Sequence, residues 1–280
     1  MGNDAGPPQG VRAPSGVTRY PGEAIWEAVY PVLPDFSVEI LPELDSTNTE
    51  LMRRARAGRL EPILLVAERQ TAGRGRLGRD WHSSAGDSLT FSLGLLVSPP
   101  DWSGLSLAVG ASVAESLHPQ VRLKWPNDLW LGGAGGDRKL GGILIETASI
   151  GQQRYAVIGI GINIAPRDPA GLCTPPASLR ELDAALDAPQ ALLRIVPSLV
   201  KTVVAFGQFG FAPFQARFNA RDVLHGRWVS VSDGKAGLLE GTAFGAGEDG
   251  ALLVHTATGM KQITSSEVSV RPQPIAGKAG

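Results

Sequence analysis

The sequence has almost no cysteine, few histidines and no long apolar run. Its single cysteine, Cys173, excludes an intrachain disulfide and any zinc site built from several cysteines, as expected in a reducing compartment such as the cytoplasm. The four histidines lie without metal-ligand spacing, at His82, His118, His225 and His255. No stretch reaches roughly eighteen consecutive apolar residues, so we expect a soluble protein without a membrane span.

The charged residues are balanced overall but biased in kind. The chain has 26 basic and 27 acidic residues among 280, a net charge of −1, so the whole molecule is not an electrostatic footprint for nucleic acid. Only 6 of the basic residues are lysines and 20 are arginines, which draws attention to Lys124 and Lys139. A hydrophobic content of 43% is enough for one large domain, with or without a small appendage.

A glycine-spaced loop with four arginines follows the apolar run Pro62 to Ala67. Residues 69–79, which we call the arginine loop, read Arg-Gln-Thr-Ala-Gly-Arg-Gly-Arg-Leu-Gly-Arg. The planar arginine fork pairs with carboxylate or phosphate, and glycines let backbone N–H groups approach the same anion. Residues 124–128 and 137–142 repeat this chemistry with Lys-Trp-Pro-Asn-Asp and Asp-Arg-Lys-Leu-Gly-Gly. The two clusters predict a site where a carboxylate meets a polyphosphate.

Glycines 73, 75 and 78 also match the G-x-G-x-x-G pattern of dinucleotide-binding folds, but their context excludes that fold. The fingerprint needs a helix directly after the glycines. Here a strand-like alternation follows over residues 88–97. A phosphate-binding loop of the G-x-x-x-x-G-K-[ST] type is also absent.

Periodicity and turn residues predict a mixed α/β domain followed by a small β-barrel that begins near Leu224. Thr47 and Glu50 have capping-box spacing, so a helix is expected to start at Thr47, where short polar side chains either cap or bind a ligand. Alternating glycines at Gly159 and Gly161 imply close approach of another backbone or a ligand. Further helices are expected over residues 23–30, 105–117, 190–206 and 213–221. Strands are expected over residues 37–41, 62–68, 88–97, 121–124, 129–131, 139–146, 154–164, 228–232, 237–246, 251–255, 260–264 and 268–270.

Individually, the candidate site residues have ordinary explanations as well. The indole of Trp81 stacks on an adenine ring or wedges the loop onto the core. Lys139 taken alone is a solvated lysine, whereas Lys124 is suited to phosphate. Asn127 and Asp128 are able to bind hydroxyls, amines or a magnesium ion.

Five motifs, taken in order, resemble those of biotin protein ligases from about residue 40 to residue 272. They are Leu44-Asp-Ser-Thr-Asn48, Gln70-Thr-Ala-Gly-Arg-Gly-Arg-Leu-Gly-Arg79 with Trp81, Lys124-Trp-Pro-Asn-Asp128, Arg138-Lys-Leu-Gly-Gly-Ile-Leu-Ile-Glu146 and Gly159-Ile-Gly-Ile-Asn163. The resemblance implies an α+β fold, with a class II aminoacyl-tRNA synthetase-like mixed β-sheet backed by helices and a C-terminal SH3-like β-barrel. It implies a flexible segment over 1–20, a catalytic domain over 21–224, the barrel over 225–272 and a flexible tail over 273–280.

The resemblance also implies a two-step reaction that forms biotinoyl-5′-AMP from biotin and MgATP and then modifies a lysine of a biotin carboxyl carrier protein. Arg76 and Lys139 would be the catalytic charges. Residues expected around biotin are Ser46, Thr47, Asn48, Gln70, Arg74, Gly75, Arg76 and Lys139. Residues expected around the nucleotide are Arg79, Trp81, Lys124, Asn127, Asp128 and Asn163. Mg²⁺ is expected to arrive with ATP near Asp128 rather than in a dedicated protein site.

Two departures from the family pattern bear on function. The turn over Gly132–Gly136 is longer than expected, and the segment before the first motif is too short for the winged helix-turn-helix of bifunctional members. We therefore expect a ligase without specific DNA binding, with homodimerisation left open. The alternatives are a lipoate or octanoate ligase, whose double-arginine signature and histidine-aspartate pair are absent, and a non-catalytic biotin-sensing repressor. A repressor would need a DNA-binding segment and could dispense with Lys139.

Overall fold

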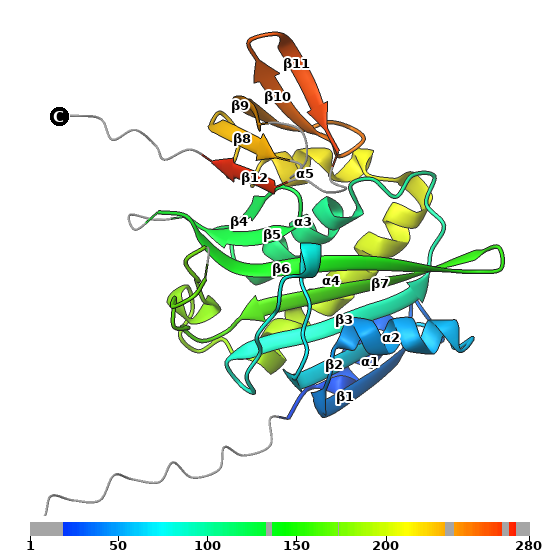
Figure 1. Cartoon of the computed structure of the whole chain (residues 1–280). Coiled ribbons are helices and arrows are strands. Elements are labelled where there is room, and N and C mark those ends of the chain that lie inside the picture. The colour runs from blue at the N-terminus through cyan, green and yellow to red at the C-terminus, as the bar shows by residue number, and fades with distance from the viewer. Residues whose placement is uncertain (1–18, 133–135, 173, 233–237, 265–268, 273–280) are drawn as a thin grey trace, which may run out of the picture.

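The computed structural model describes residues 19–132, 136–172, 174–232, 238–264 and 269–272 (Figure 1). Most of the expected N-terminal flexible segment, the C-terminal tail, the centre of the Gly132–Gly136 turn and Cys173 lie outside the described residues. The described chain forms two β-sheets with helices, which confirms a mixed α/β architecture with a C-terminal antiparallel β unit.

The larger sheet has seven strands in the order β1-β2-β3-β7-β6-β5-β4. Only the pair β1 and β2 is parallel, and the other neighbours are antiparallel. Its strands are β1 (Ser37–Leu44), β2 (Ile63–Gln70), β3 (Ser88–Leu96), β4 (Val121–Lys124), β5 (Asp128–Leu131), β6 (Arg138–Ile150) and β7 (Gln153–Asn163). The arginine loop therefore joins two neighbouring antiparallel strands, β2 and β3, as expected. No helix opens after Gly78, which agrees with the exclusion of a dinucleotide-binding fold.

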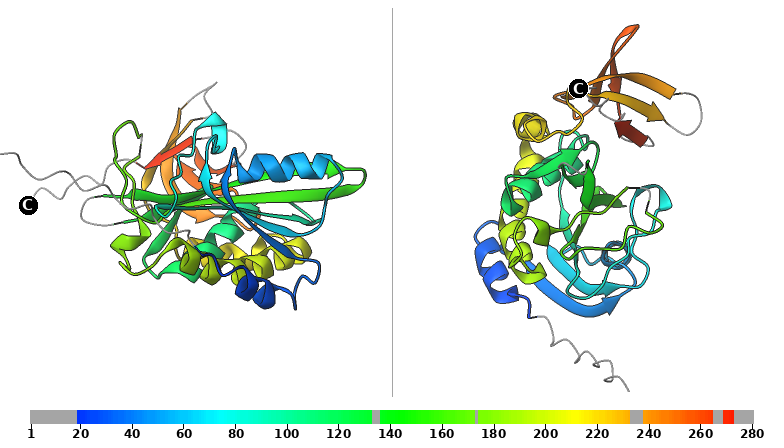
Figure 2. Two further views of the ribbon diagram at one scale, coloured as in Figure 1. Left: turned by 90° about the horizontal axis from the view of Figure 1, so that it is seen from below. Right: turned by 90° about the vertical axis from the view of Figure 1, so that its left-hand side faces the viewer.

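Helices cover the two faces of this sheet unequally (Figure 2). On one face lie α1 (Gly22–Val29), α3 (Leu105–Leu117) and α4 (Ala188–Phe209). On the other face α2 (Thr47–Arg56) buries Leu51, Met52 and Ala55 against Tyr155 and Val157. Because α2 is the one α-helix packed there in the described chain, part of this face is left to the arginine loop.

The helix α4 is long and apolar enough to cross a membrane by length and composition. It contains no uninterrupted apolar run of that length, because polar residues such as Lys201 lie within it. Ile195, Leu199 and Val203 are fully buried in the core, and α4 packs against α1 and α3. It is accordingly the core helix of the main body.

The smaller sheet is antiparallel in the order β11-β10-β9-β8-β12. Its strands are β8 (Trp228–Ser232), β9 (Leu238–Ala246), β10 (Leu252–Thr256), β11 (Gly259–Ile263) and β12 (Ser269–Pro272). Val229 and Val270 belong to the same buried cluster as the main core, and the indole Nε1 of Trp125 donates to the carbonyl of Gly250 at 3.0 Å. The C-terminal sheet is thus packed onto the main body. The expected helix over 213–221 is instead a 3-10 turn (Ala212–Phe214) followed by a short α5 (Gln215–Asn219).

Candidate active site

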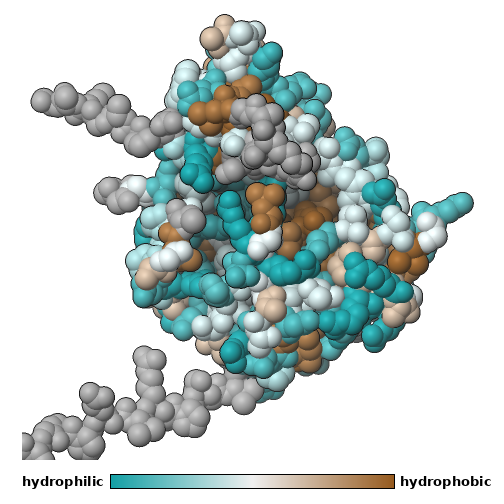
Figure 3. Space-filling view, viewed as in Figure 1, coloured by the Kyte–Doolittle hydropathy of each residue, from teal (hydrophilic) through white to brown (hydrophobic). Residues whose placement is uncertain are grey.

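A pocket opens on the face of the large sheet that carries α2, beneath the arginine loop. In Figure 3 this face is mostly hydrophilic, with a small hydrophobic patch near its centre. The pocket is lined by the start of α2, the arginine loop, the β4–β5 hairpin, strands β3, β6 and β7, and Val270 of β12. Residues far apart in sequence therefore share one cavity.

One end of the pocket is built around the start of α2. The helix begins at Thr47 as expected, but Ser46 rather than Thr47 is the N-cap, and its hydroxyl accepts from the Thr49 amide at 3.4 Å. Thr47 is free for another role because it lies one position inside the helix. Its amide and hydroxyl both donate to Oε1 of Gln70, at 2.8 and 3.1 Å.

Asn48 is held by hydrogen bonds on both sides of its amide. Its Nδ2 donates to the carbonyl of Leu144 at 3.1 Å and to Oε2 of Glu146 at 2.9 Å. Its Oδ1 accepts from the Ser92 hydroxyl at 2.7 Å. The Ser92 hydroxyl also lies 2.7 Å from the hydroxyl of Thr47. Asn48, Thr47 and Ser92 are all buried. Fully paired polar networks in a buried setting fix side-chain orientation, so Thr47 and Asn48 form a rigid, uncharged surface at this end of the pocket.

The alternating glycines of β7 make room for side chains rather than for another backbone. A Cβ at Gly159 would lie 2.1 Å from Oδ1 of Asn48, and one at Gly161 would lie 2.4 Å from the indole of Trp81. Both glycines line the pocket. The indole Nε1 of Trp81 is buried and has no hydrogen-bond partner among the described residues. The indole of Trp81 is therefore packed flat against the glycine face of β7.

The arginine loop is a small hairpin over the pocket. The backbones of Arg74 and Asp80 pair in an isolated antiparallel β-bridge, and the Gly75 amide donates to the Arg79 carbonyl at 2.7 Å. Leu77 at its tip has φ of 57°, a conformation uncommon for leucine.

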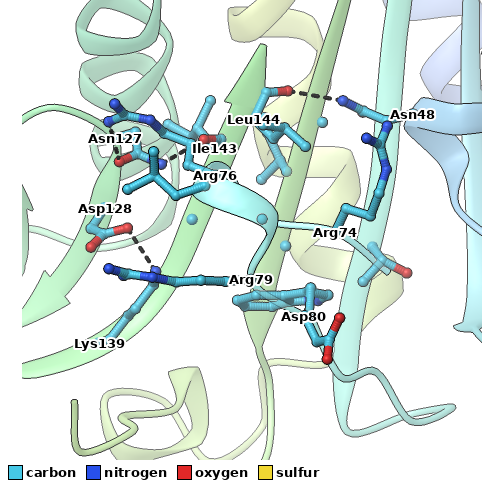
Figure 4. A pocket seen from close by; sticks show the side chains of 18 of the residues that line it. Asn48, Arg74, Arg76, Arg79, Asp80, Asn127, Asp128, Lys139, Ile143 and Leu144 are labelled. Atoms are coloured by element: carbon cyan, nitrogen blue, oxygen red, sulfur yellow. Dashed lines mark hydrogen bonds and ion pairs between the residues drawn. The ribbon is translucent and has the colours of Figure 1, made fainter. Parts of the chain in front are cut away.

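The arginine side chains leave this loop in different directions (Figure 4). Arg74 points toward α2 and pairs with Glu146 at 2.9 Å. Arg76 donates to Oδ1 of Asn127 at 3.2 Å, and Arg79 extends toward Asp128 and Lys139. Arg74 is thus neutralised, whereas Arg76 and Arg79 add charge to the opposite end of the pocket.

That opposite end gathers four cations around Asp128. Lys139 Nζ lies 2.7 Å from Oδ1 of Asp128, and Lys124 Nζ lies 4.9 Å above the Trp130 ring. Burial lowers the pKa of Lys124, and the nearby charges of Lys139, Arg79 and Arg271 lower it further against the opposing effect of Asp128. Burial likewise lowers the pKa of the Arg76 guanidinium, and neighbouring Arg79 adds to this. An anion bound here would favour the charged forms of Lys124 and Arg76 and so raise both pKa values.

Asn127 ties this end together. Its Nδ2 donates to the Ile143 carbonyl at 2.8 Å, and its own carbonyl accepts from the Ile143 amide at 3.0 Å. Since its Oδ1 holds Arg76, the β4–β5 hairpin, β6 and the arginine loop are joined through one side chain.

All the residues expected at the site except Asn163 line this pocket. Asn163 is buried, and its Nδ2 donates to the carbonyls of Ala177 at 3.0 Å and Lys139 at 3.3 Å. Asn163 therefore contacts the backbone of Lys139 and does not face the cavity. Sequence reasoning also gave no role to Glu146, Ser92 or Val270. Glu146 ends a quoted motif and so carried a signal, whereas nothing in the sequence connects Val270 to a pocket in the other sheet.

No group of three or more histidine, cysteine, aspartate or glutamate side chains suited to a metal occurs within the described ranges. Among the described residues that line the pocket, the acids are Asp80 and Asp128, so cations outnumber acids there and the pocket is suited to anions.

Two family models match the chain. The biotin/lipoate A/B protein ligase family matches residues 41–163, and the biotin protein ligase C-terminal domain matches residues 224–271. The bifunctional ligase/repressor BirA of Escherichia coli is 36% identical over 245 residues, which cover 84% of this chain and 74% of that protein. The biotin–[acetyl-CoA-carboxylase] ligase of Paracoccus denitrificans is 32% identical, with 82% and 98% coverage. The structure of biotin protein ligase from Aquifex aeolicus in complex with biotin and ATP is similar, with a TM-score of 0.71, 31% identity and coverage of 84% and 99%.

Proposed function

This chain belongs to the biotin protein ligase family, and we propose that it joins biotin to a lysine of a carboxylase's biotin-acceptor domain in two steps. In the first step a carboxylate oxygen of biotin attacks the α-phosphorus of MgATP, giving biotinoyl-5′-AMP and pyrophosphate. In the second step the neutral amine of the acceptor lysine attacks the acyl carbon, forming an amide and releasing AMP and a proton.

The observation that carries this proposal is the pairing of a neutral end and a cationic end in one pocket. A ring such as that of biotin needs a polar surface without net charge, and Thr47, Asn48 and Gln70 form one beside apolar Phe91 and Ile160. Its carboxylate and the phosphates of ATP are all anions and repel one another. Arg76, Arg79, Lys124 and Lys139 offset that repulsion where the two substrates meet.

We assign the two catalytic charges to Arg76 and Lys139. Lys139 lies beside Asp128, so its position is fixed before substrate binds. A preorganised cation stabilises the charge that develops on the α-phosphate without having to reorient during the reaction. Arg76, held by Asn127, does the same from the loop above. No enzyme nucleophile is required.

We place biotin and its carboxylate against Ser46, Thr47, Asn48, Gln70, Gly75, Arg76 and Lys139. Arg74 has a modified role in this proposal, since its pairing with Glu146 makes it an anchor of the loop. We place the nucleotide against Arg79, Trp81, Lys124, Asn127 and Asp128, which all line the pocket. MgATP is the substrate, and the carboxylate of Asp128 is the oxygen donor in the pocket best suited to face the ion.

The finer description of the fold is also part of this proposal. We take residues 21–224 as the catalytic domain of the class II aminoacyl-tRNA synthetase-like type and residues 225–272 as an SH3-like unit. The five short antiparallel strands of the C-terminal sheet support the second assignment.

The test is transfer of labelled biotin to protein. The purified chain is mixed with radiolabelled biotin, MgATP and a biotin-acceptor domain, and protein-bound label is measured. Lys139→Ala should reduce biotin-dependent pyrophosphate exchange on the order of a hundredfold or more, because one preorganised donor to the transition state is lost. Lys201→Ala, which removes an exposed lysine of α4, is the matched control. Labelling by lipoate or octanoate in place of biotin, or exchange at the parental rate in Lys139→Ala, would contradict the assignment.

A further inference from the structure

Three consecutive residues at the start of β6 each contact a different part of the molecule. Asp137 pairs with Arg227, which lies directly before β8 of the C-terminal sheet. Arg138 pairs with Glu181 at 2.6 Å, and Lys139 pairs with Asp128 at 2.7 Å. The direction of the chain at Lys139 is therefore set by contacts from three sides.

The strand itself gives Lys139 limited support. The register between β5 and β6 shifts at this point, since Trp130 pairs with Lys139 and Leu129 with Gly141. Such a bulge leaves a residue unpaired and bends the strand, so the neighbouring contacts decide where the side chain points. The Lys139 amide donates to the Pro175 carbonyl at 2.9 Å, and its carbonyl accepts from the Ala177 amide at 2.8 Å.

Arg227 is a firm attachment point. Its carbonyl accepts from the Ala243 amide at 2.9 Å, and its own amide donates to the Leu224 carbonyl at 2.9 Å. The side chains of Asp137 and Arg227 are only 22% and 20% exposed, so solvent screens their attraction less than that of a surface pair. In the part of the chain that the structure describes, this is the one ion pair that crosses from residues before Leu224 to residues after it.

We propose that Asp137 and Arg227 are a positioning pair through which the C-terminal sheet holds Lys139 in its catalytic orientation. The inference rests on the proposed function and extends it to two residues outside the pocket. Neither side chain touches the substrates, so the pair acts only through the start of β6. Loss of the pair should let the bulged segment tilt and move Lys139 Nζ away from the reacting phosphate.

The test compares Asp137→Asn with a reversed pair, Asp137→Arg combined with Arg227→Asp. Adenylate formation is measured without an acceptor by pyrophosphate exchange, and kcat and the KM for biotin are separated. Asp137→Asn should lower kcat by roughly tenfold, because small displacements of a catalytic group are costly, and leave the KM for biotin within about twofold. The reversed pair should recover most of that loss. Glu115→Gln, which breaks a part-exposed pair between α3 and α5, is the control and should leave kcat unchanged.

Thermal unfolding of every variant is followed in parallel. The inference is overturned if Asp137→Asn turns over at the parental rate, if its loss only follows the fraction of folded protein, or if the reversed pair is no better than Asp137→Arg alone. A raised KM with unchanged kcat would also overturn it, because the pair would then shape the binding site. If the parent chain itself forms no biotinoyl adenylate, the proposed function fails first.

Discussion

Replacing Gly159 by alanine should damage both stability and biotin binding. The added Cβ would lie 2.1 Å from Oδ1 and 2.8 Å from Cγ of Asn48, closer than packed atoms can approach. Asn48 cannot rotate away without cost, since its amide donates to Leu144 and Glu146 and its carbonyl accepts from Ser92. Either β7 shifts or the buried network opens.

The size of the effect follows from these two routes. Overpacking a buried site costs about 1–3 kcal/mol, and each buried polar group left without a partner costs about 1–3 kcal/mol. The mutant would relax partly by each route, so we expect the free energy of unfolding to fall by about 2–4 kcal/mol. For a chain of 280 residues that corresponds to a drop of roughly 3–7 °C in the unfolding midpoint. Biotin affinity should fall by about tenfold or more, because Asn48 leaves the neutral end of the pocket.

Circular dichroism melting and isothermal titration with biotin measure the two quantities. Gly22→Ala is the matched control, because its Cβ would meet Ile40 at an ordinary 3.4 Å and alanine is the better helix former at the start of α1. A Gly159→Ala protein with the parental midpoint and biotin affinity would refute the reasoning that the glycine exists to admit Asn48.

Three further predictions concern the loop, the C-terminal sheet and a buried acid. Arg76→Gly should shorten retention of biotinoyl-AMP and label bystander proteins, since the loop loses its tie to Asn127; adenylate held as long as by the parent would contradict this. A fragment of residues 16–224 should form little biotinoyl-AMP even without acceptor, because Val270 lines the pocket and Trp125 loses its bond to Gly250; a soluble fragment with full adenylation activity would exclude this role. Burial raises the pKa of Asp222 from 3.8 to about 6, so the folded state holds this proton more tightly and stability is lost as pH rises from about 4 to about 6. Asp222→Asn should therefore gain about 2 kcal/mol in unfolding free energy relative to the parent between pH 4 and pH 7, and denaturant titrations showing no pH-dependent difference would refute it.

The sequence alone determined the local structure and the chemical character of the site. Helix α3 and strands β4 and β8 have the bounds that periodicity and turn residues predict, because the apolar residues of each can be read without knowing what they pack against. The arginine loop likewise predicted an anion site, because fixed charges and glycines suit anions whatever the rest of the fold. Five ordered motifs then pointed to one family.

Tertiary structure decided which of these groups face one another. Asn48 and Glu146 are 98 residues apart and meet only because α2 packs over β6. The carboxylate of Glu146 also neutralises Arg74. Asn163 shares a face of β7 with Gly159 and Gly161, yet the segment that pairs with Lys139 covers it and takes its amide out of the pocket. Residues 137 and 227 likewise join two sheets in a contact that no local pattern encodes. Periodicity reports which side of an element is buried, whereas the partner on that side depends on how the sheets and helices pack.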